Sequence, residues 1–524
     1  MTTVSTPAPP VDREWDRLVA VTGFGLPVLM LAAVPAVQYP YWQWTALALT
    51  TPVATWGAWP LYREALGGLR HGRVGPVTLT ALAVVAAFGW SLWALLFGGA
   101  GATTHTHPLD LLAPRPADTA QFYLEVAALL VVATLALRRL VSGIPLQEPG
   151  DPSFPPARTA RWAGRWYVPA TLCLAGAAVG FWTGADIAAT AVSAGLAVLA
   201  IAAPLAVELT VPVATAIGLR RAAELGVRIG DGAAAAAGSV DVVVLGRALL
   251  CTTPVVTAVV VAADTDEPDA LAVAAALAAH SPDPRATALT GGAAFPPSIS
   301  GITVDDKGTV RATTGARAVA LGRPEALCQD LPAELGTPDL VVAWDGQVRA
   351  GFTVTTDRHP DAPDAVRALR ALGLTPVLLT TAPDEEAQAL AEGLDIDLVL
   401  PDADPAGKVE VVRRLRADGH GVVVAAGPGA AHAVAADLPL AVGATDGSGG
   451  LGIAAGSPRD AATAVRLARR ISGVSEGGLA IALGAALVGL PAAAAGLVHP
   501  LLAAAIGPAV TAFVVLNGLR LRRS

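Results

Sequence analysis

The sequence predicts an α-helical membrane bundle of about eight transmembrane helices, joined to a water-soluble α/β domain that carries an inserted α+β domain. Of its 524 residues, 53% are hydrophobic and only 15% are charged, whereas about a quarter of the residues in a soluble domain are charged. Long apolar runs flank one large stretch of more mixed composition, residues 222–473. Within that stretch short apolar runs alternate with helical patterns, as in a parallel sheet covered by helices.

The apolar runs come close to, or exceed, the roughly 20 residues that a helix needs to cross the hydrocarbon. They lie at 18–37, 42–62, 77–97, 121–137, 166–182, 187–219, 478–497 and 500–519. The predicted parts of the chain are therefore a disordered tail (1–17), helices one to four (18–137), a short loop (138–165), helices five and six (166–221) and, after the soluble stretch, helices seven and eight with a basic C-terminus (474–524).

Arginine placement predicts the orientation, because loops on the cytoplasmic side carry an excess of basic residues. Arginines gather before the first run, after the second, fourth and sixth, before the seventh and at the C-terminus, whereas the alternate loops hold almost none except Arg115. We expect an integral plasma-membrane protein with both termini and the 222–473 domain in the cytoplasm. The net charge of −8 argues against a nucleic-acid partner.

The soluble stretch begins with a valine-rich run at 242–245, which is typical of a strand buried on both faces. Such a strand needs strand neighbours, so we expect 222–262 and 340–473 to form one sheet. The residues between them, 263–339, are predicted to be an inserted domain with a helix at 269–279 and strands near 301–304, 309–313 and 316–321.

This order of parts resembles the P-type ATPases, most closely the heavy-metal (copper-type) pumps. The resemblance extends to TPVATWGAWPLYREALGGLRHG at 51–72, SLWALL at 91–96 and VVLNGLRLRR at 514–523. It implies a haloacid-dehalogenase-like phosphorylation domain in 222–262 and 340–473, split by a nucleotide-binding-like insert at 263–339.

In that family a strand ends in Asp-Lys-Thr-Gly-Thr, and ATP phosphorylates the aspartate. The corresponding residues are Gly246-Arg247-Ala248-Leu249-Leu250, so the nucleophile is missing. The family's Thr-Gly-Asp loop corresponds to Thr380-Thr381-Ala382, and its Mg²⁺-holding Gly-Asp-Gly-x-Asn-Asp loop to 427–432. The degenerate positions are Gly246, Arg247, Thr380, Ala382, Pro428 and His432. No catalytic residue is predicted.

Other parts of the family pattern are also altered. Lys408, in PAGK, matches a phosphate-contacting lysine and is the nucleotide- or phosphate-binding candidate, with a solvated lysine at a helix start as the alternative. The adenine-contacting Ser-Glu-His-Pro corresponds to Ser281-Pro282-Asp283-Pro284. The loop at 140–165 has about 26 residues and no Thr-Gly-Glu, too short for the family's actuator domain.

No metal site is predicted in the membrane, because the family's Cys-Pro-Cys corresponds to Ala203-Pro204-Leu205 and both thiolates are lost. The candidates for an ion path are Glu125, Pro204, Glu208 and Thr511. A carboxylate inside the bilayer costs about 2.5–3.5 kcal/mol on insertion scales. We therefore expect Glu208 to point inward, towards the helix of Glu125 or of Thr511, whether it serves ions or is protonated and hydrogen-bonded to Thr210 or to the carbonyl freed by Pro204.

The resulting hypothesis is a catalytically inactive membrane homologue of the heavy-metal pumps, a pseudo-pump with a regulatory or partner role. One alternative is an active cation transporter of altered mechanism, and another is a membrane-bound nucleotide-sensing module. ATP and Mg²⁺ are cofactors only if the family activity persists. The expected partners are membrane lipid and either an intact P-type ATPase or another membrane protein.

Overall fold

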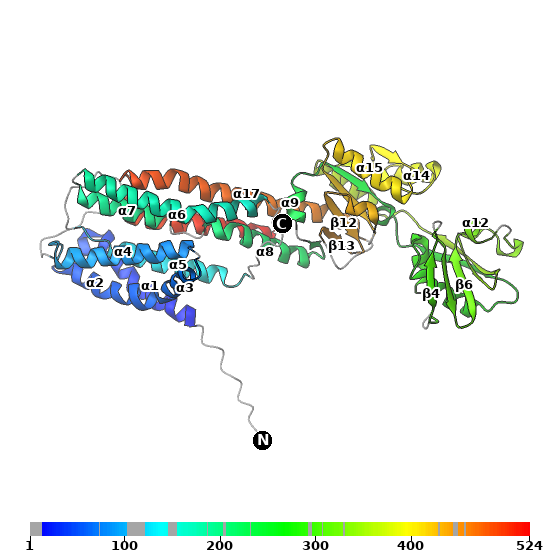
Figure 1. Cartoon of the computed structure of the whole chain (residues 1–524), viewed down its shortest axis with the longest axis horizontal. Coiled ribbons are helices and arrows are strands. Elements are labelled where there is room, and N and C mark those ends of the chain that lie inside the picture. The colour runs from blue at the N-terminus through cyan, green and yellow to red at the C-terminus, as the bar shows by residue number, and fades with distance from the viewer. Residues whose placement is uncertain are drawn as a thin grey trace, which may run out of the picture. The chain divides into compact units, whose positions relative to one another are not determined.

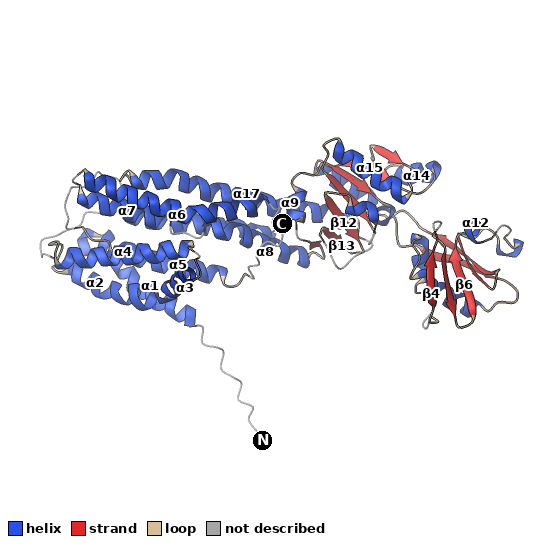
Figure 2. Ribbon diagram, in the orientation of Figure 1, coloured by secondary structure: helices blue, strands red, loops and turns tan. Residues whose placement is uncertain are grey.

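The computed structural model describes residues 13–523 except 73, 102–120, 145–154, 186, 203–205, 231, 292–295, 306–307, 329–330, 428–429, 444–448 and 455–456. It divides into two compact units. The helical unit comprises the described residues up to Leu225 and from Leu467 onward, and the α/β unit comprises Gly226–Arg466 (Figures 1 and 2).

The helical unit is built from long helices separated by short turns. Its helices are α1 (Arg13–Ala33), α2 (Trp42–Pro52), α3 (Trp59–Arg70), α4 (Pro76–Leu96), α5 (Leu124–Val141), α6 (Pro155–Gly184), α7 (Ala188–Ala202), α8 (Ala206–Glu224), most of α17 (Arg459–Ala494) and α18 (Pro500–Leu519). Its shorter pieces are η1 (Pro35–Val37), a π-helical turn η2 (Val53–Gly57) and η5 (Arg520–Arg523).

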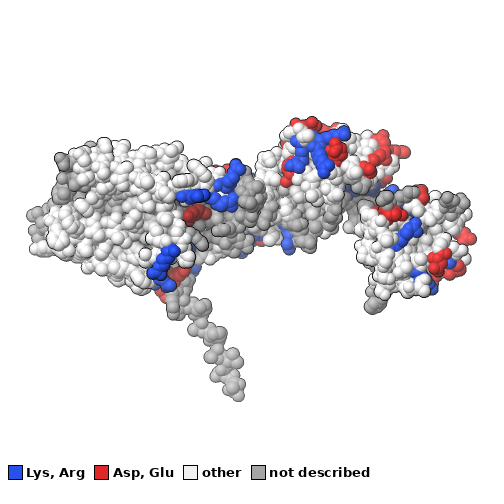
Figure 3. Space-filling model, viewed as in Figure 1, with Lys and Arg blue, Asp and Glu red and all other residues white. Residues whose placement is uncertain are grey.

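Six stretches among the described residues are long and apolar enough to cross a membrane: Glu14–Ala33, Pro76–Leu96, Pro156–Gly184, Ala189–Glu224, Arg459–Ala494 and Pro500–Arg522. Figure 3 shows that charged side chains on the visible face of this unit gather towards one end. The predicted count of about eight spans is not confirmed. The second predicted span is divided into α2 and α3 by η2, beside Pro52, which lacks the backbone N–H of a regular helix. The fourth, α5, has only 18 residues and contains Glu125, Arg138 and Arg139.

Two other predicted boundaries are wrong. Helix α1 begins at Arg13, inside the predicted disordered tail, of which residues 1–12 lie outside the described residues. The predicted loop at 138–165 is helical up to Val141 and again from Pro155. Helix α6 starts earlier because Pro155 and Pro156 suit a first helical turn.

Close approach of small residues holds the helices together, as is usual between membrane helices. Helix α18 contacts α5, α7 and α8, and α6 packs on α7. A Cβ atom on Gly218 of α8 would lie 2.3 Å from Cγ1 of Ile471 in α17. A side chain at position 218 would therefore push these two helices apart.

The first sheet of the α/β unit is seven-stranded, in the order β1-β13-β12-β11-β2-β9-β10. The strands are β1 (Arg228–Ile229), β2 (Val242–Leu245), β9 (Thr375–Leu379), β10 (Leu398–Leu400), β11 (Val422–Ala426), β12 (Leu438–Val442) and β13 (Leu451–Ile453). All neighbours are parallel except β1 and β13. Val244 of β2 lies between Val424 and Val377, which confirms that the first valine run joins the later strands.

Helices accompany this sheet, as an alternating strand-helix pattern predicts. They are α9 (Ala233–Ala237), α10 (Arg247–Leu250), α13 (Ala362–Ala371), α14 (Asp384–Ala391), α15 (Pro405–Ala417) and α16 (Ala431–Val434). Val412 of α15 packs with Val244, Leu379 and Val424 in one buried cluster.

The second sheet is six-stranded and antiparallel, in the order β3-β8-β7-β6-β5-β4. Its strands are β3 (Val255–Val261), β4 (Ser300–Val304), β5 (Val310–Thr314), β6 (Arg317–Gly322), β7 (Leu340–Trp344) and β8 (Gln347–Thr355). Its helices are α11 (Glu267–Ala278), η3 (Pro284–Leu289), α12 (Pro324–Leu327) and η4 (Ala333–Leu335). Side chains of α11 and η3 share a core with β5 to β8.

The predicted insert boundaries, 263 and 339, are therefore wrong. Strands β3, β7 and β8 were expected in the first sheet, but they belong to the second. The turn at Asp345 (φ 52°) and Gly346 (φ 78°) joins β7 and β8 in a tight hairpin. This hairpin pairs with β3 through β8 and with β6 through β7, so the insert runs from about 255 to 355.

Candidate functional site

The candidate site lies where three neighbouring parallel strands of the seven-stranded sheet end. Strand β2 lies between β11 and β9, so the residues that follow them, Gly246, Gly427 and Thr380, meet at one edge of the sheet. The predicted loops are thus brought together, although Pro428 lies outside the described residues. The backbone N–H of Gly246 donates to the Ala425 carbonyl at 2.9 Å. A Cβ atom at position 246 would lie 3.0 Å from that oxygen, so the position is tight.

The loop after β9 is closed by its own hydrogen bonds. Thr380 is 1% exposed, and its hydroxyl oxygen accepts a hydrogen bond from the Ala382 N–H at 3.1 Å. The Ala382 side chain is also buried, where the resembling family has its aspartate. Thr380 therefore stabilises a turn, and Ala382 supplies no oxygen for a metal.

Three basic side chains near these strand ends lie close enough together to influence one another. Burial is the main cause that lowers the pKa of Lys408, and the nearby Arg247 guanidinium lowers it further. Burial also lowers the pKa of His432 to about 4, with a smaller contribution from the Lys408 charge. Arg247, Lys408 and His432 thus form a cationic cluster in which the imidazole is neutral at pH 7. Lys408 is half-buried and lies near the start of α15.

Two residues at this edge were not predicted. Glu386, from the first turn of α14, forms an ion pair with Arg247. Cys251 is buried, which raises the pKa of its thiol, although the neighbouring Arg247 opposes the shift. The acidic run 384–386 could have indicated a partner for Arg247, but no local pattern indicates a contact between residues 139 positions apart.

The residues present do not fit Mg²⁺, which requires several oxygen ligands in a regular arrangement. Gly246 and Ala382 carry no side-chain oxygen, the 427–432 loop has no carboxylate in its sequence, and Glu386 is held by Arg247. Among the described residues there is no group of three or more His, Cys, Asp or Glu side chains that could hold a metal ion. The arrangement can attract an anion, but Gly246, Ala382 and the 427–432 loop supply no side-chain carboxylate as a nucleophile or metal ligand for phosphoryl transfer.

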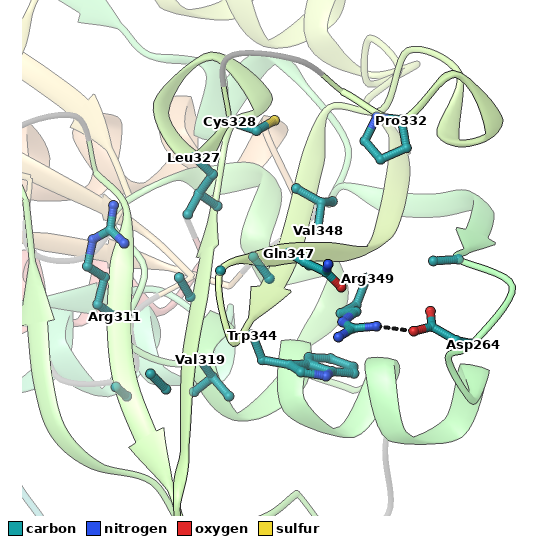
Figure 4. A pocket seen from close by; sticks show the side chains of 16 residues that line it. Asp264, Arg311, Val319, Leu327, Cys328, Pro332, Trp344, Gln347, Val348 and Arg349 are labelled. Atoms are coloured by element: carbon teal, nitrogen blue, oxygen red, sulfur yellow. Dashed lines mark hydrogen bonds and ion pairs between the residues drawn. The ribbon is translucent and has the colours of Figure 1, made fainter.

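In the insert, Asp283 of the segment that corresponds to the adenine-contacting motif interacts with neighbouring residues of the same domain. The carboxylate of Asp283 pairs with Arg323 at 2.9 Å and accepts the Arg285 N–H at 3.0 Å. A separate pocket of about 560 Å³ lies beside the β7–β8 hairpin (Figure 4). There the Arg349 guanidinium lies 5.9 Å from the centre of the Trp344 ring and pairs with Asp264. Neither Asp283 nor Arg323 lines this pocket.

The ion-path candidates do not converge as predicted. Glu125, in the first turn of α5, is 6% exposed, and Thr511 of α18 is buried with its hydroxyl donating to the Gly507 carbonyl at 3.1 Å. Glu208 of α8 is exposed at the surface of the helical unit, and one carboxylate oxygen lies 3.8 Å from where a Cβ of Gly75 would be. Pro204 lies outside the described residues.

The phase of α8 explains why Glu208 does not point inward. Its buried residues include Val207, Thr210, Val211 and Ala214, whereas Glu208 shares the less buried stripe with residues 212, 215 and 219. The alternative hydrogen bond between Glu208 and Thr210 is not present either, and the Thr210 hydroxyl donates to the Ala206 carbonyl at 2.6 Å. The expectation that Glu208 faces Glu125 or Thr511 is wrong.

The fold and this site define a membrane protein with a haloacid-dehalogenase-like α/β domain. A family model described as haloacid dehalogenase-like hydrolase matches residues 247–436. The chain is 27% identical to the cation-transporting P-type ATPase B of Mycobacterium bovis, over 94% of this chain and 83% of that protein. It is 28% identical to the copper-exporting P-type ATPase of Mycobacterium tuberculosis, over 94% and 82%.

A solved structure of a zinc-transporting PIB-type ATPase in the E2.Pi state matches with a TM-score of 0.50 at 19% identity, covering 98% of this chain and 100% of that chain. The chain belongs to the P-type ATPase family, in its heavy-metal, copper-type branch. The resemblance found in the sequence is confirmed.

His432 is expected to make the α/β unit sensitive to acid. Its pKa in the folded protein is about 4, below the ordinary value of about 6.5 in an unfolded chain. The unfolded state therefore binds a proton first, and stability is lost as pH falls from about 6.5 towards 4. Replacing His432 with Gln should flatten this part of the pH dependence of the thermal unfolding midpoint. An unchanged pH profile in the variant would contradict the burial of His432 beside Lys408.

Proposed function

We propose that the protein is a pseudo-pump, a membrane-embedded homologue of the heavy-metal P-type ATPases that forms no phosphoenzyme and acts on a partner. The observation that carries the proposal is Gly246 at the end of the central strand β2, where a nucleophilic side chain would have to stand. Next to Gly246, Arg247 forms an ion pair with Glu386, and its charge lowers the pKa of Lys408, so basic side chains stand near the strand end instead of metal ligands.

The alignments also support the loss of the actuator domain. The alignment with the cation-transporting relative runs over 633 positions although this chain has 524 residues, so the relative carries segments that this chain lacks. The sequence between α5 and α6 is short enough for the actuator domain to be one of them. Without the actuator, the nucleophile and the thiolates of the sixth predicted span, a transport cycle driven by ATP has lost several independent parts.

Specific observations favour each of the two alternatives. A buried carboxylate, Glu125, at the start of α5 favours a cation transporter of altered mechanism. The cluster of Arg247 and Lys408 favours a nucleotide-sensing module, since cations at strand ends attract phosphate. We place the α/β unit and both termini in the cytoplasm and the chain in the plasma membrane, from the arginine asymmetry.

Reconstitution of the full chain separates these functions. In proteoliposomes we expect no ATP-dependent movement of Cu⁺, Zn²⁺ or protons. Co-reconstitution with an intact heavy-metal P-type ATPase of the same cell is expected to change the transport rate of that pump. Flux by the chain alone that Glu125→Gln abolishes would favour the transporter, and stabilisation by ATP that Lys408→Gln abolishes would favour the sensor. If the intact pump were unaffected, a partner role with that pump would be refuted.

A further inference from the structure

A pocket of about 220 Å³ lies at the arginine-rich ends of helices α5, α8 and α18. It is formed after the end of α5, along the last turns of α8 and at η5, which follows α18. Its lining residues are Gly143, Ile144, Ala216, Ile217, Arg220, Arg221, Glu224 and Arg522. All of them belong to the helical unit, and two of the apolar spans, Ala189–Glu224 and Pro500–Arg522, end there.

The lining has three arginines and one carboxylate, so it carries a net positive charge. Glu224 lies 3.5 Å from Arg220 and 3.2 Å from Arg221. Among the described residues no carboxylate lies within ion-pair distance of Arg522. The carboxylate therefore offsets only part of the positive charge.

Arginines at such helix ends are common, because a positive charge interacts favourably with the negative C-terminal end of the helix dipole and because cytoplasmic loops are enriched in basic residues. That explanation accounts for single exposed residues such as Arg70, in the last turn of α3. It does not account for arginines from two separate elements, α8 and η5, that line the same concavity. The concavity also has an apolar wall, Ile144, Ala216 and Ile217.

We propose that this pocket binds the phosphate of an anionic phospholipid headgroup. Guanidinium groups match phosphate oxygens with paired hydrogen bonds, and basic pockets between membrane helices are suited to anionic headgroups. Since a water molecule occupies about 30 Å³ in the liquid, the pocket has room for a phosphate group and part of its glycerol. The apolar wall would contact the carbon atoms of the lipid that follow the glycerol. This site is independent of the proposed pseudo-pump function.

The test uses the full chain, purified in a mild detergent and depleted of lipid. Phosphatidylglycerol is titrated in and bound lipid is measured by native mass spectrometry, with phosphatidylcholine, glycerol 3-phosphate and inorganic phosphate in parallel. Arg522→Gln and Arg221→Gln should each weaken phosphatidylglycerol binding about fivefold, the effect of one basic residue near an anionic surface. Glu224→Gln should strengthen it, because the competing carboxylate is removed.

The matched control is Arg70→Gln, which removes the same charge from an exposed helix end outside the pocket. Arg70→Gln should bind phosphatidylglycerol as tightly as the unmodified chain does. An equal loss in Arg70→Gln and Arg522→Gln would overturn the site in favour of diffuse surface attraction. If glycerol 3-phosphate or inorganic phosphate bound as tightly as phosphatidylglycerol, the ligand would be a soluble anion and the lipid assignment would fail. Glu224→Gln keeps the test decisive even if an arginine variant does not fold, since a gain of binding requires a folded chain.

Discussion

Incubation of the purified protein with γ-labelled ATP and Mg²⁺, followed by acid quenching, is expected to leave no label on the chain. An acyl-phosphate needs a carboxylate as nucleophile, and Gly246 has no side chain. Removing a nucleophile from an enzyme costs on the order of a millionfold in rate. The carboxylate of Glu386 is held in an ion pair with Arg247. The measurement is hydroxylamine-sensitive label after gel separation, with an intact heavy-metal pump treated in parallel.

Restoring the aspartate alone should not restore the label. In Gly246→Asp the new Cβ would meet the Ala425 carbonyl oxygen at 3.0 Å, so the strand end must shift slightly. Ala382 and the 427–432 loop would still supply no carboxylate for Mg²⁺. Label on the unmodified chain would refute the pseudo-pump. Label on Gly246→Asp alone would show that the metal site survives in a form that these side chains do not indicate.

The sequence predicted the central sheet well because its signal is local. Residues 242–245 are all apolar, and a strand with no polar face must be enclosed by other strands and by helices. The same rule failed for Leu340–Trp344, where all five residues are buried as well. That strand lies in an antiparallel sheet, and burial alone does not distinguish the two kinds of sheet. The hairpin turn at Asp345 and Gly346 was the signal that could have placed it with β8.

For the candidate site, the sequence predicted only which catalytic and metal-binding residues of the family are replaced. Resemblance located Gly246, Thr380 and Ala382, and the parallel strand order brings them to one edge. The contacts that replace the lost chemistry depend on tertiary packing. Glu386 and Arg247 meet because the helix after β9 lies near the start of the helix after β2. No spacing in the sequence contains that information.

The error at Glu208 has a different origin. The cost of a carboxylate in hydrocarbon predicts that it avoids lipid, but it does not specify which neighbour it finds. The rotation of α8 is set by its apolar contacts with α18 and α6, and these leave Glu208 near Gly75 at the start of α4. A single polar residue does not determine the phase of a helix whose other residues are mostly apolar.

Val244→Asp is expected to destabilise the seven-stranded sheet strongly while the helical unit is unaffected. Val244 is 1% exposed and lies between Val424 and Val377 in the centre of the sheet. The variant loses a buried apolar side chain and places a carboxyl group where it has no partner, which together cost on the order of 4 kcal/mol. This corresponds to about a thousandfold faster amide hydrogen exchange in β2, β9 and β11, measured by mass spectrometry of the full chain.

Val434→Asp is the matched control, because it makes the same change in the same unit at a residue that is 86% exposed. Its effect should stay within about 0.5 kcal/mol, with unchanged exchange in all three strands. Equal protection in the two variants would mean that β2 is not enclosed between β11 and β9. Loss of protection confined to β2 would mean that this strand can detach while β9 and β11 remain protected. Either of these two results would contradict a sheet organised around the valine run at 242–245.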